Sequence, residues 1–140
     1  MSLKDIINDK WKEAFKARDT ARRAAYELVK QRIMIAEKSG QVELPLSDDY
    51  ITNLIIKEVK EREDVLTFYY PADPEYINSK MIIDELSQYL PKQMTEDEVI
   101  EIIKRIKQTE SNMGKVIGLT VKEVGNRFDK SKIAALVRSV

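Results

Sequence analysis

Apolar residues in this sequence recur every three or four positions along most of the chain, and no segment alternates apolar with polar residues. The first spacing places apolar side chains on one face of an α-helix, whereas strict alternation is typical of a half-buried strand. The pattern therefore predicts an all-α protein.

The first part of the chain begins with two predicted helices. Ser2 is a suitable N-cap for a first helix that runs to about Ala17. A second helix begins near Asp19 or Thr20 and ends at Gly40, because glycine commonly follows the last helical residue. Its apolar sector is wide, so we expect it to be buried against more than one neighbour.

Two further helices are predicted before the chain reaches Pro91. Ser47 can cap a third helix that stops before Pro71, since proline disfavours helical geometry in the preceding residue. Asp73-Pro74 is a helix start signal, and Pro91 ends the fourth helix. The predicted inner faces of these helices carry Ile51, Leu54, Ile55, Val59, Leu66 and Tyr69, and Ile77, Ile82, Leu86 and Leu90.

The remainder of the chain predicts three shorter helices. Thr95 and Glu98 form a capping-box pattern at the start of the first of them. Residues Met113–Val124 read as the second, ended by Gly125, and Asp129 is the expected N-cap of the last. We therefore predict an N-terminal four-helix domain over residues 1–91 and a small three-helix domain over residues 92–140.

The composition removes several classes of function. The chain has no histidine and no cysteine, so the commonest general base, the commonest metal ligand and a thiol nucleophile are all missing. Its longest apolar run, Ile133–Val137, is too short to span a bilayer, and the N-terminus has no apolar region typical of a signal peptide. We expect a cytoplasmic protein that does not contact a membrane.

The charges are balanced overall but unevenly distributed. Residues 4–38 carry ten Lys or Arg and six Asp or Glu, residues 39–101 carry five and fifteen, and residues 102–140 carry nine and three. The basic ends either fold against the acidic middle or offer a surface to a polyanion. The acidic clusters are typical of helix N-termini and solvated faces, so we predict no metal site, no cofactor and no catalytic residue.

The segment MGKVIG, residues 113–118, places two glycines four positions apart in a predicted helix. It has neither the spacing nor the preceding strand of a phosphate-binding loop. Each glycine inside a helix costs about 1 kcal/mol, so a close contact with another backbone is the expected compensation. We favour a contact with a neighbouring helix of the same domain, with an external ligand as the alternative.

Four segments together resemble the YqeY family, whose C-terminal part is similar to the tail domain of the GatB subunit of tRNA-dependent amidotransferase. They are KARDTARRAAYELVKQRI, IIKEVKEREDVLTFY, LSQYLPKQMTEDEV and NMGKVIGLTVKEVGNRFDKSKIAALV, and the last two are the most specific. The resemblance covers nearly the full chain. It implies an all-helical N-terminal bundle followed by a small helical domain that contacts tRNA.

Carried over by position, the resemblance implies a tRNA-facing surface made of seven residues: Gly114, Lys115, Gly118, Lys122 and Arg127, with Lys130 and Lys132 as secondary candidates. It also implies tRNA, or a protein of the aminoacyl-tRNA pathway, as the partner. We therefore expect a non-catalytic accessory protein that binds tRNA or a tRNA-amidotransferase or synthetase complex.

Two alternatives stay open. One is a protein–protein adaptor whose glycine face docks a partner helix without binding RNA. The other is a carbon–nitrogen ligase that uses glutamine as the amido donor, which only the family resemblance suggests. The sequence offers no activated nucleophile for it, since Ser111 and Ser131 have no histidine to accept their protons.

Overall fold

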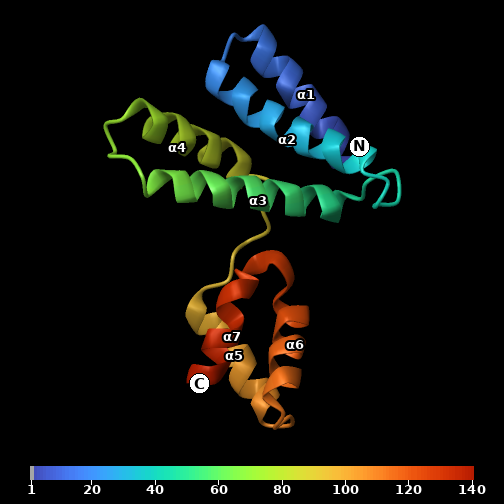
Figure 1. Ribbon diagram of the computed structural model, residues 1–140, viewed down its shortest axis with the longest axis vertical. Helices are drawn as coiled ribbons and strands as arrows, with labels where there is room; N and C mark the ends of the chain where they lie inside the picture. Colours follow the sequence, from blue (N-terminus) through green and yellow to red (C-terminus); the bar gives the residue numbers. More distant parts are fainter. Residues whose placement is uncertain (1) are drawn as a thin grey trace. The chain divides into compact units, whose positions relative to one another are not determined.

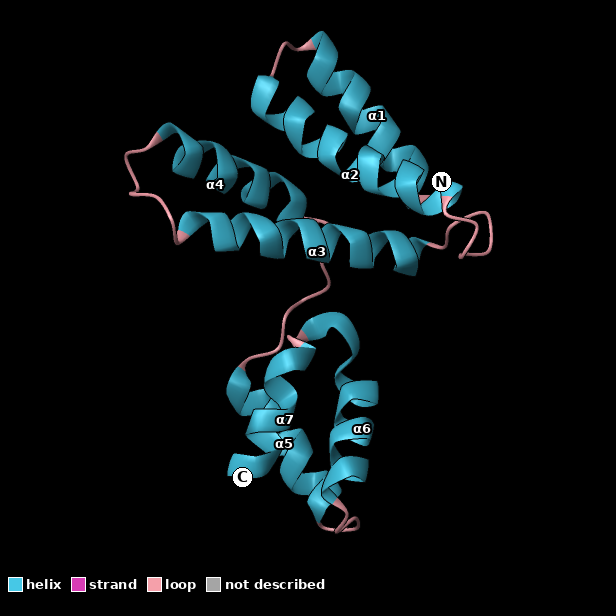
Figure 2. Cartoon of the chain, viewed as in Figure 1, coloured by secondary structure: helices cyan, strands magenta, loops and turns pink. Residues whose placement is uncertain are grey.

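The computed structural model describes residues 2–140 and confirms the all-α prediction, with no strand among the described residues. Figures 1 and 2 show helices joined by loops and turns. The helices are α1 (Leu3–Lys16), α2 (Thr20–Lys38), α3 (Asp48–Leu66), α4 (Pro74–Ser87), α5 (Glu96–Lys107), α6 (Met113–Val124) and α7 (Lys130–Ser139), with a short 3-10 helix, η1 (Gly125–Arg127).

The chain divides into two compact units. Helices α1–α4 form one unit that ends at Leu90, and helices α5–α7 form another that begins at Pro91. Each unit has its own cluster of buried apolar side chains. Because a separate core is what allows a segment to fold alone, each unit is described by itself below.

In the first unit, α2 lies at the centre. It packs against α1, α3 and α4, which explains its wide apolar sector. Figure 1 shows α1 and α2 as one antiparallel pair and α3 and α4 as another. The fully buried large side chains of this core are Ile7, Tyr26, Val29, Ile51, Ile55, Ile82 and Leu86.

A buried ion network joins α2 to α3. Glu58 is only 3% exposed. Its Oε1 atom lies 3.3 Å from Arg32 Nε, and its Oε2 atom lies 3.4 Å from Arg62 Nε. Arg32 also reaches the exposed Glu61 at 2.5 Å. Burial alone lowers the pKa of Arg32, but the hydrogen bonds that Arg32 donates to Glu61 and Glu58 outweigh this effect, and the pKa is raised. Glu58 therefore forms ion pairs with an arginine of α2 and with one of its own helix.

A second polar network joins α2 to α4. The Tyr26 hydroxyl donates a short hydrogen bond to Glu85 and lies 2.7 Å from the Tyr89 hydroxyl. Arg22 Nε lies 3.3 Å from the other oxygen of Glu85. Burial, followed by the hydrogen bonds to Glu85 and Tyr89, raises the pKa of Tyr26 above its ordinary value of 10.0. The folded protein therefore keeps this hydroxyl protonated.

Replacing Tyr26 by phenylalanine is expected to lower the free energy of unfolding by about 1–2 kcal/mol near neutral pH, because Glu85 loses a donor. The wild-type protein should also lose stability above about pH 10, where the unfolded chain releases the Tyr26 proton and the folded chain keeps it. Urea unfolding at about pH 8 and pH 10.5 measures both effects. A Tyr26→Phe variant that loses as much stability over this pH range as the wild type would contradict the assignment.

Two sequence predictions about α3 and α4 are wrong. Helix α3 ends at Leu66, whereas the sequence predicted that it continues to the residue before Pro71. The helix ends earlier because the backbone N–H and the hydroxyl of Thr67 both donate hydrogen bonds to the Asp64 carbonyl. Tyr69 therefore leaves the predicted inner face and is 41% exposed. Ile77 is also exposed, since the buried side of α4 is formed by Ser79, Ile82, Ile83 and Leu86.

Candidate nucleic-acid interface

Helix α6 carries most of the candidate site. Its N-cap is Asn112, whose side chain accepts a hydrogen bond from the backbone N–H of Lys115 at 3.1 Å. It ends at Gly125, which has a φ of 61°, a left-handed conformation that favours glycine. The inward side chains Val116, Thr120 and Val124 are buried between α5 and α7. Ile117 and Val121 are partly buried beside them, and the opposite side of the helix faces solvent.

The two glycines lie on that exposed side. A Cβ added to Gly118 would meet no heavy atom within 4 Å, and one added to Gly114 would meet only Asn112 Oδ1, at 3.3 Å. The predicted contact with a neighbouring helix of the same domain is therefore wrong. The physical reason is that the row through Val116, Thr120 and Val124 makes the packing contacts, and the glycines lie across the helix from it.

Two lysines share the exposed side with the glycines. Gly114, Gly118 and Lys122 follow one another at intervals of four residues and so form one row along the helix. Lys115 lies beside this row, seven residues before Lys122, which corresponds to about 10 Å along the helix axis. Both lysines are exposed, and neither pairs with an acidic residue of the described chain. We call Gly114, Lys115, Gly118 and Lys122 the outer face of α6.

Lys130 and Lys132 lie in the first turn of α7, just beyond η1. Both are exposed, and no ion pair is formed by either within residues 2–140. Since the end of α6 leads through η1 directly into α7, these lysines lie near the same end of α6 as Lys122 (Figure 1). Lys115 lies at the opposite end of the helix.

Other basic side chains of this unit are engaged in structural contacts. Arg127 donates from Nε to the Val124 carbonyl at 3.2 Å and from Nη2 to the Glu123 carbonyl at 2.9 Å, so it caps the end of α6. Lys107 donates to the carbonyls of Val137 and Val140, and Arg105 pairs with Glu123. Arg127 is thus a helix-capping residue beside the lysines of the candidate surface.

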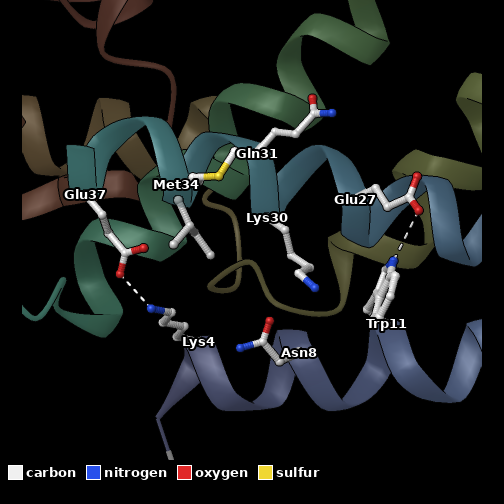
Figure 3. A pocket seen from close by; sticks show the side chains of 9 residues that line it. Lys4, Asn8, Trp11, Glu27, Lys30, Gln31, Met34 and Glu37 are labelled. Carbon is white, nitrogen blue, oxygen red and sulfur yellow. Dashed lines mark hydrogen bonds and ion pairs between the residues drawn. The ribbon is translucent and has the colours of Figure 1, made fainter. Parts of the chain in front are cut away.

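A hollow that was not predicted from the sequence lies between α1 and α2. It has a volume of about 390 Å³ and is walled by Trp11 and Met34 (Figure 3). Trp11 Nε1 donates to Glu27 at 3.3 Å, Lys30 Nζ lies 3.9 Å from the indole centroid, and Lys4 pairs with Glu37 at 2.6 Å. Hydrogen bonds from Arg23 and Trp11 lower the pKa of Glu27. Because these charges pair or stack with one another, the hollow shows no preference for a charged ligand.

Two kinds of structure are not found in the described part of the chain. No three acidic side chains among residues 2–140 are grouped closely enough to hold a metal ion. None of the described helices combines the length and apolar character needed to cross a bilayer.

Replacing Gly118 by alanine is expected to raise the free energy of unfolding of the α5–α7 unit by about 1 kcal/mol, since alanine favours helix and its Cβ meets no atom. Gly125→Ala is the matched control, and it should destabilise the unit by about 1 kcal/mol because Gly125 has a positive φ. Urea unfolding followed by far-UV circular dichroism measures both. A destabilising Gly118→Ala would show that this glycine is packed.

The family model described as Yqey-like protein matches residues 4–140 of the chain. No curated protein matches it. The match spans both compact units and covers the α-helices of the described residues apart from the first residue of α1.

Proposed function

Because the chain belongs to the YqeY family, we propose that it is a non-catalytic accessory protein that binds tRNA through the outer face of α6 and the lysines of the first turn of α7. The partner is either tRNA alone or tRNA in complex with an amidotransferase or synthetase. This proposal assigns Gly114, Lys115, Gly118 and Lys122 to the contact surface, with Lys130 and Lys132 beside them.

The observation that supports the proposal best is the exposure of two glycines beside two lysines on one side of α6. A glycine on a helix surface lets a ligand backbone approach the helix more closely than any other residue does. The lysine ammonium groups supply charge for phosphate oxygens, and they have no acidic partner among the described residues that would have to be displaced. A helix that loses about 1 kcal/mol per exposed glycine without a packing gain is consistent with selection for binding.

The chemistry of the surface favours recognition of phosphates and shape over recognition of bases. Phe128, the one aromatic residue in the sequence of residues 91–140, is partly buried against the core of the α5–α7 unit. Base stacking on an exposed aromatic ring is therefore not part of the proposed contact. Folded RNA presents its backbone at fixed spacing, and a helix with basic residues at both ends fits such a ligand.

The direct test is binding of a tRNA transcript, measured by fluorescence anisotropy over a series of salt concentrations. The double variant Lys115→Glu/Lys122→Glu should weaken binding by about tenfold or more at low salt, and it should reduce the slope of log Kd against log salt by about 0.7 to 0.9 per lost phosphate contact. The matched control is Lys12→Glu, an exposed lysine of α1. Arg127 is unsuitable as a test position, because its substitution also removes the cap of α6.

Two results would contradict RNA binding: no affinity for the transcript at low salt, or equal affinity of the double variant and the wild type. The exposed glycine face also suits the adaptor alternative, in which a partner helix packs on it. In that case Gly118→Leu should abolish a protein interaction that survives nuclease treatment, while the lysine variant should retain it.

A further inference from the structure

The loop between α3 and α4 exposes two large aromatic rings. Phe68 is 81% exposed and Tyr70 is 80% exposed, more than any other large hydrophobic side chain of the described residues. We call residues 67–73 the aromatic loop. Aromatic side chains of this size contribute much of the free energy of protein interfaces when they are buried, and their full exposure gives the folded chain no stability.

Hydrogen bonds hold the backbone of the aromatic loop in place. Phe68 N–H donates to the Val65 carbonyl at 3.0 Å, and Tyr70 N–H donates to the Asp73 side chain at 2.8 Å. Asp73 N–H in turn donates to the Tyr70 carbonyl at 2.9 Å. A loop that is already ordered loses less conformational entropy when its side chains bind a partner. The two rings therefore extend from a backbone that is held by hydrogen bonds before any partner binds.

The residues that flank the aromatic loop are acidic. Glu63 and Asp64 lie in the last turn of α3, and Asp73 and Glu75 lie at the start of α4. Of the nearby basic residues, Arg62 pairs with Glu58 at 3.4 Å, and Lys80 pairs with Asp84 at 3.7 Å. Acidic residues thus flank the aromatic loop on both sides along the chain.

Helix stability explains only half of these acidic residues. Asp73 and Glu75 lie at a helix N-terminus, where negative charge is favourable. Glu63 and Asp64 lie at the C-terminal end of α3, which has no basic residue in its last turn, and negative charge there opposes the helix dipole. Features that reduce the stability of the free chain and lie together on its surface are typical of a binding site.

We propose that the aromatic loop docks a partner protein that offers an apolar recess bordered by lysine or arginine side chains. The exposed rings of Phe68 and Tyr70 enter the recess, and the acidic residues at both ends of the loop meet the basic border. The same negative charge repels nucleic acids and anionic membranes, so neither is the expected occupant. The site lies in the α1–α4 unit and does not depend on RNA binding by the other unit.

The test uses a phage-displayed library of random short peptides, selected on the full-length protein and counter-selected on the Phe68→Ser/Tyr70→Ser variant. The enriched peptides should contain large apolar residues and an excess of Lys and Arg over Asp and Glu. A synthetic copy of an enriched peptide should bind about tenfold or more weakly to the double variant, as expected for loss of two anchoring side chains. Binding should also weaken for Asp64→Lys and at high salt.

Two control variants distinguish binding at the aromatic loop from nonspecific binding to exposed apolar or acidic side chains. Ile35→Ser removes another apolar side chain that is 68% exposed, and Glu43→Lys reverses another exposed acidic residue. Both controls should bind the peptide within about twofold of wild type, as is usual for surface positions outside an interface. Circular dichroism of each variant verifies that the helices are retained.

Several results would overturn the proposal. Enriched peptides without positive charge, or equal binding by the wild type and the double variant, exclude the stated partner. Sedimentation that shows a wild-type dimer lost in the double variant assigns the loop to a second copy of the chain instead. Binding to anionic vesicles or to RNA that requires Phe68 and Tyr70 assigns it to those ligands.

Discussion

Replacing Glu58 by alanine is expected to lower the free energy of unfolding of the α1–α4 unit by about 3 kcal/mol. The carboxylate is buried and lies between Arg32 and Arg62, so its removal leaves two guanidinium groups close together without their common partner. Both arginine side chains are themselves mostly buried, with relative exposures of 23% and 28%. Water therefore replaces the lost carboxylate poorly.

Urea unfolding followed by tryptophan fluorescence measures this loss, because the single tryptophan, Trp11, lies in α1 and reports on the α1–α4 unit. The control is Glu61→Ala, which removes the exposed partner of Arg32 and should cost at most about 1 kcal/mol. Equal losses for the two variants would show that burial of Glu58 does not increase the contribution of the ion pair.

The second large effect is expected in the core of the α5–α7 unit. Ile103→Ala should destabilise this unit by about 3 kcal/mol, since Ile103 is fully buried and its truncation leaves a cavity. A unit this small has little stability to lose, so a large part of the population should be unfolded. The urea concentration at the midpoint of the Trp11 fluorescence transition should equal that of the wild type, because Trp11 packs against the core of the α1–α4 unit.

Far-UV circular dichroism detects the loss of the α5–α7 helices, and comparison with Trp11 fluorescence tests the proposed division of the chain into two domains. The control is Leu119→Ala, since Leu119 is 46% exposed and its truncation leaves no cavity. A single transition that shifts equally for both probes would show that the two units unfold together.

Local signals were sufficient to predict the helix starts. Thr95 and Glu98 form both hydrogen bonds of the predicted capping box, and Ser2, Ser47 and Asp129 each cap the predicted helix. Capping depends on residues only three positions apart, so the sequence contains the whole interaction. The end of α3 was predicted less well, because no glycine marks it and the side chain of Thr67 closes the helix.

Contacts between distant parts of the chain were not predictable in the same way. Glu58 and Arg62 lie four residues apart on one helix, but the ion pair that buried Glu58 forms with Arg32 joins it to another helix. The hollow beside Trp11 likewise requires α1 and α2 together. For the glycines, spacing predicted a shared face correctly, but it does not tell whether that face meets protein or solvent.

The exposed glycines of α6 also affect its motions. A helix with two residues of low helix propensity on its solvent side opens locally at a lower free energy than a helix of better formers with the same buried contacts. Its backbone amides therefore exchange with solvent through brief openings that need no unfolding of the whole unit. A ligand held on the outer face of α6 closes those openings, so binding at this helix is linked to ordering of the helix itself.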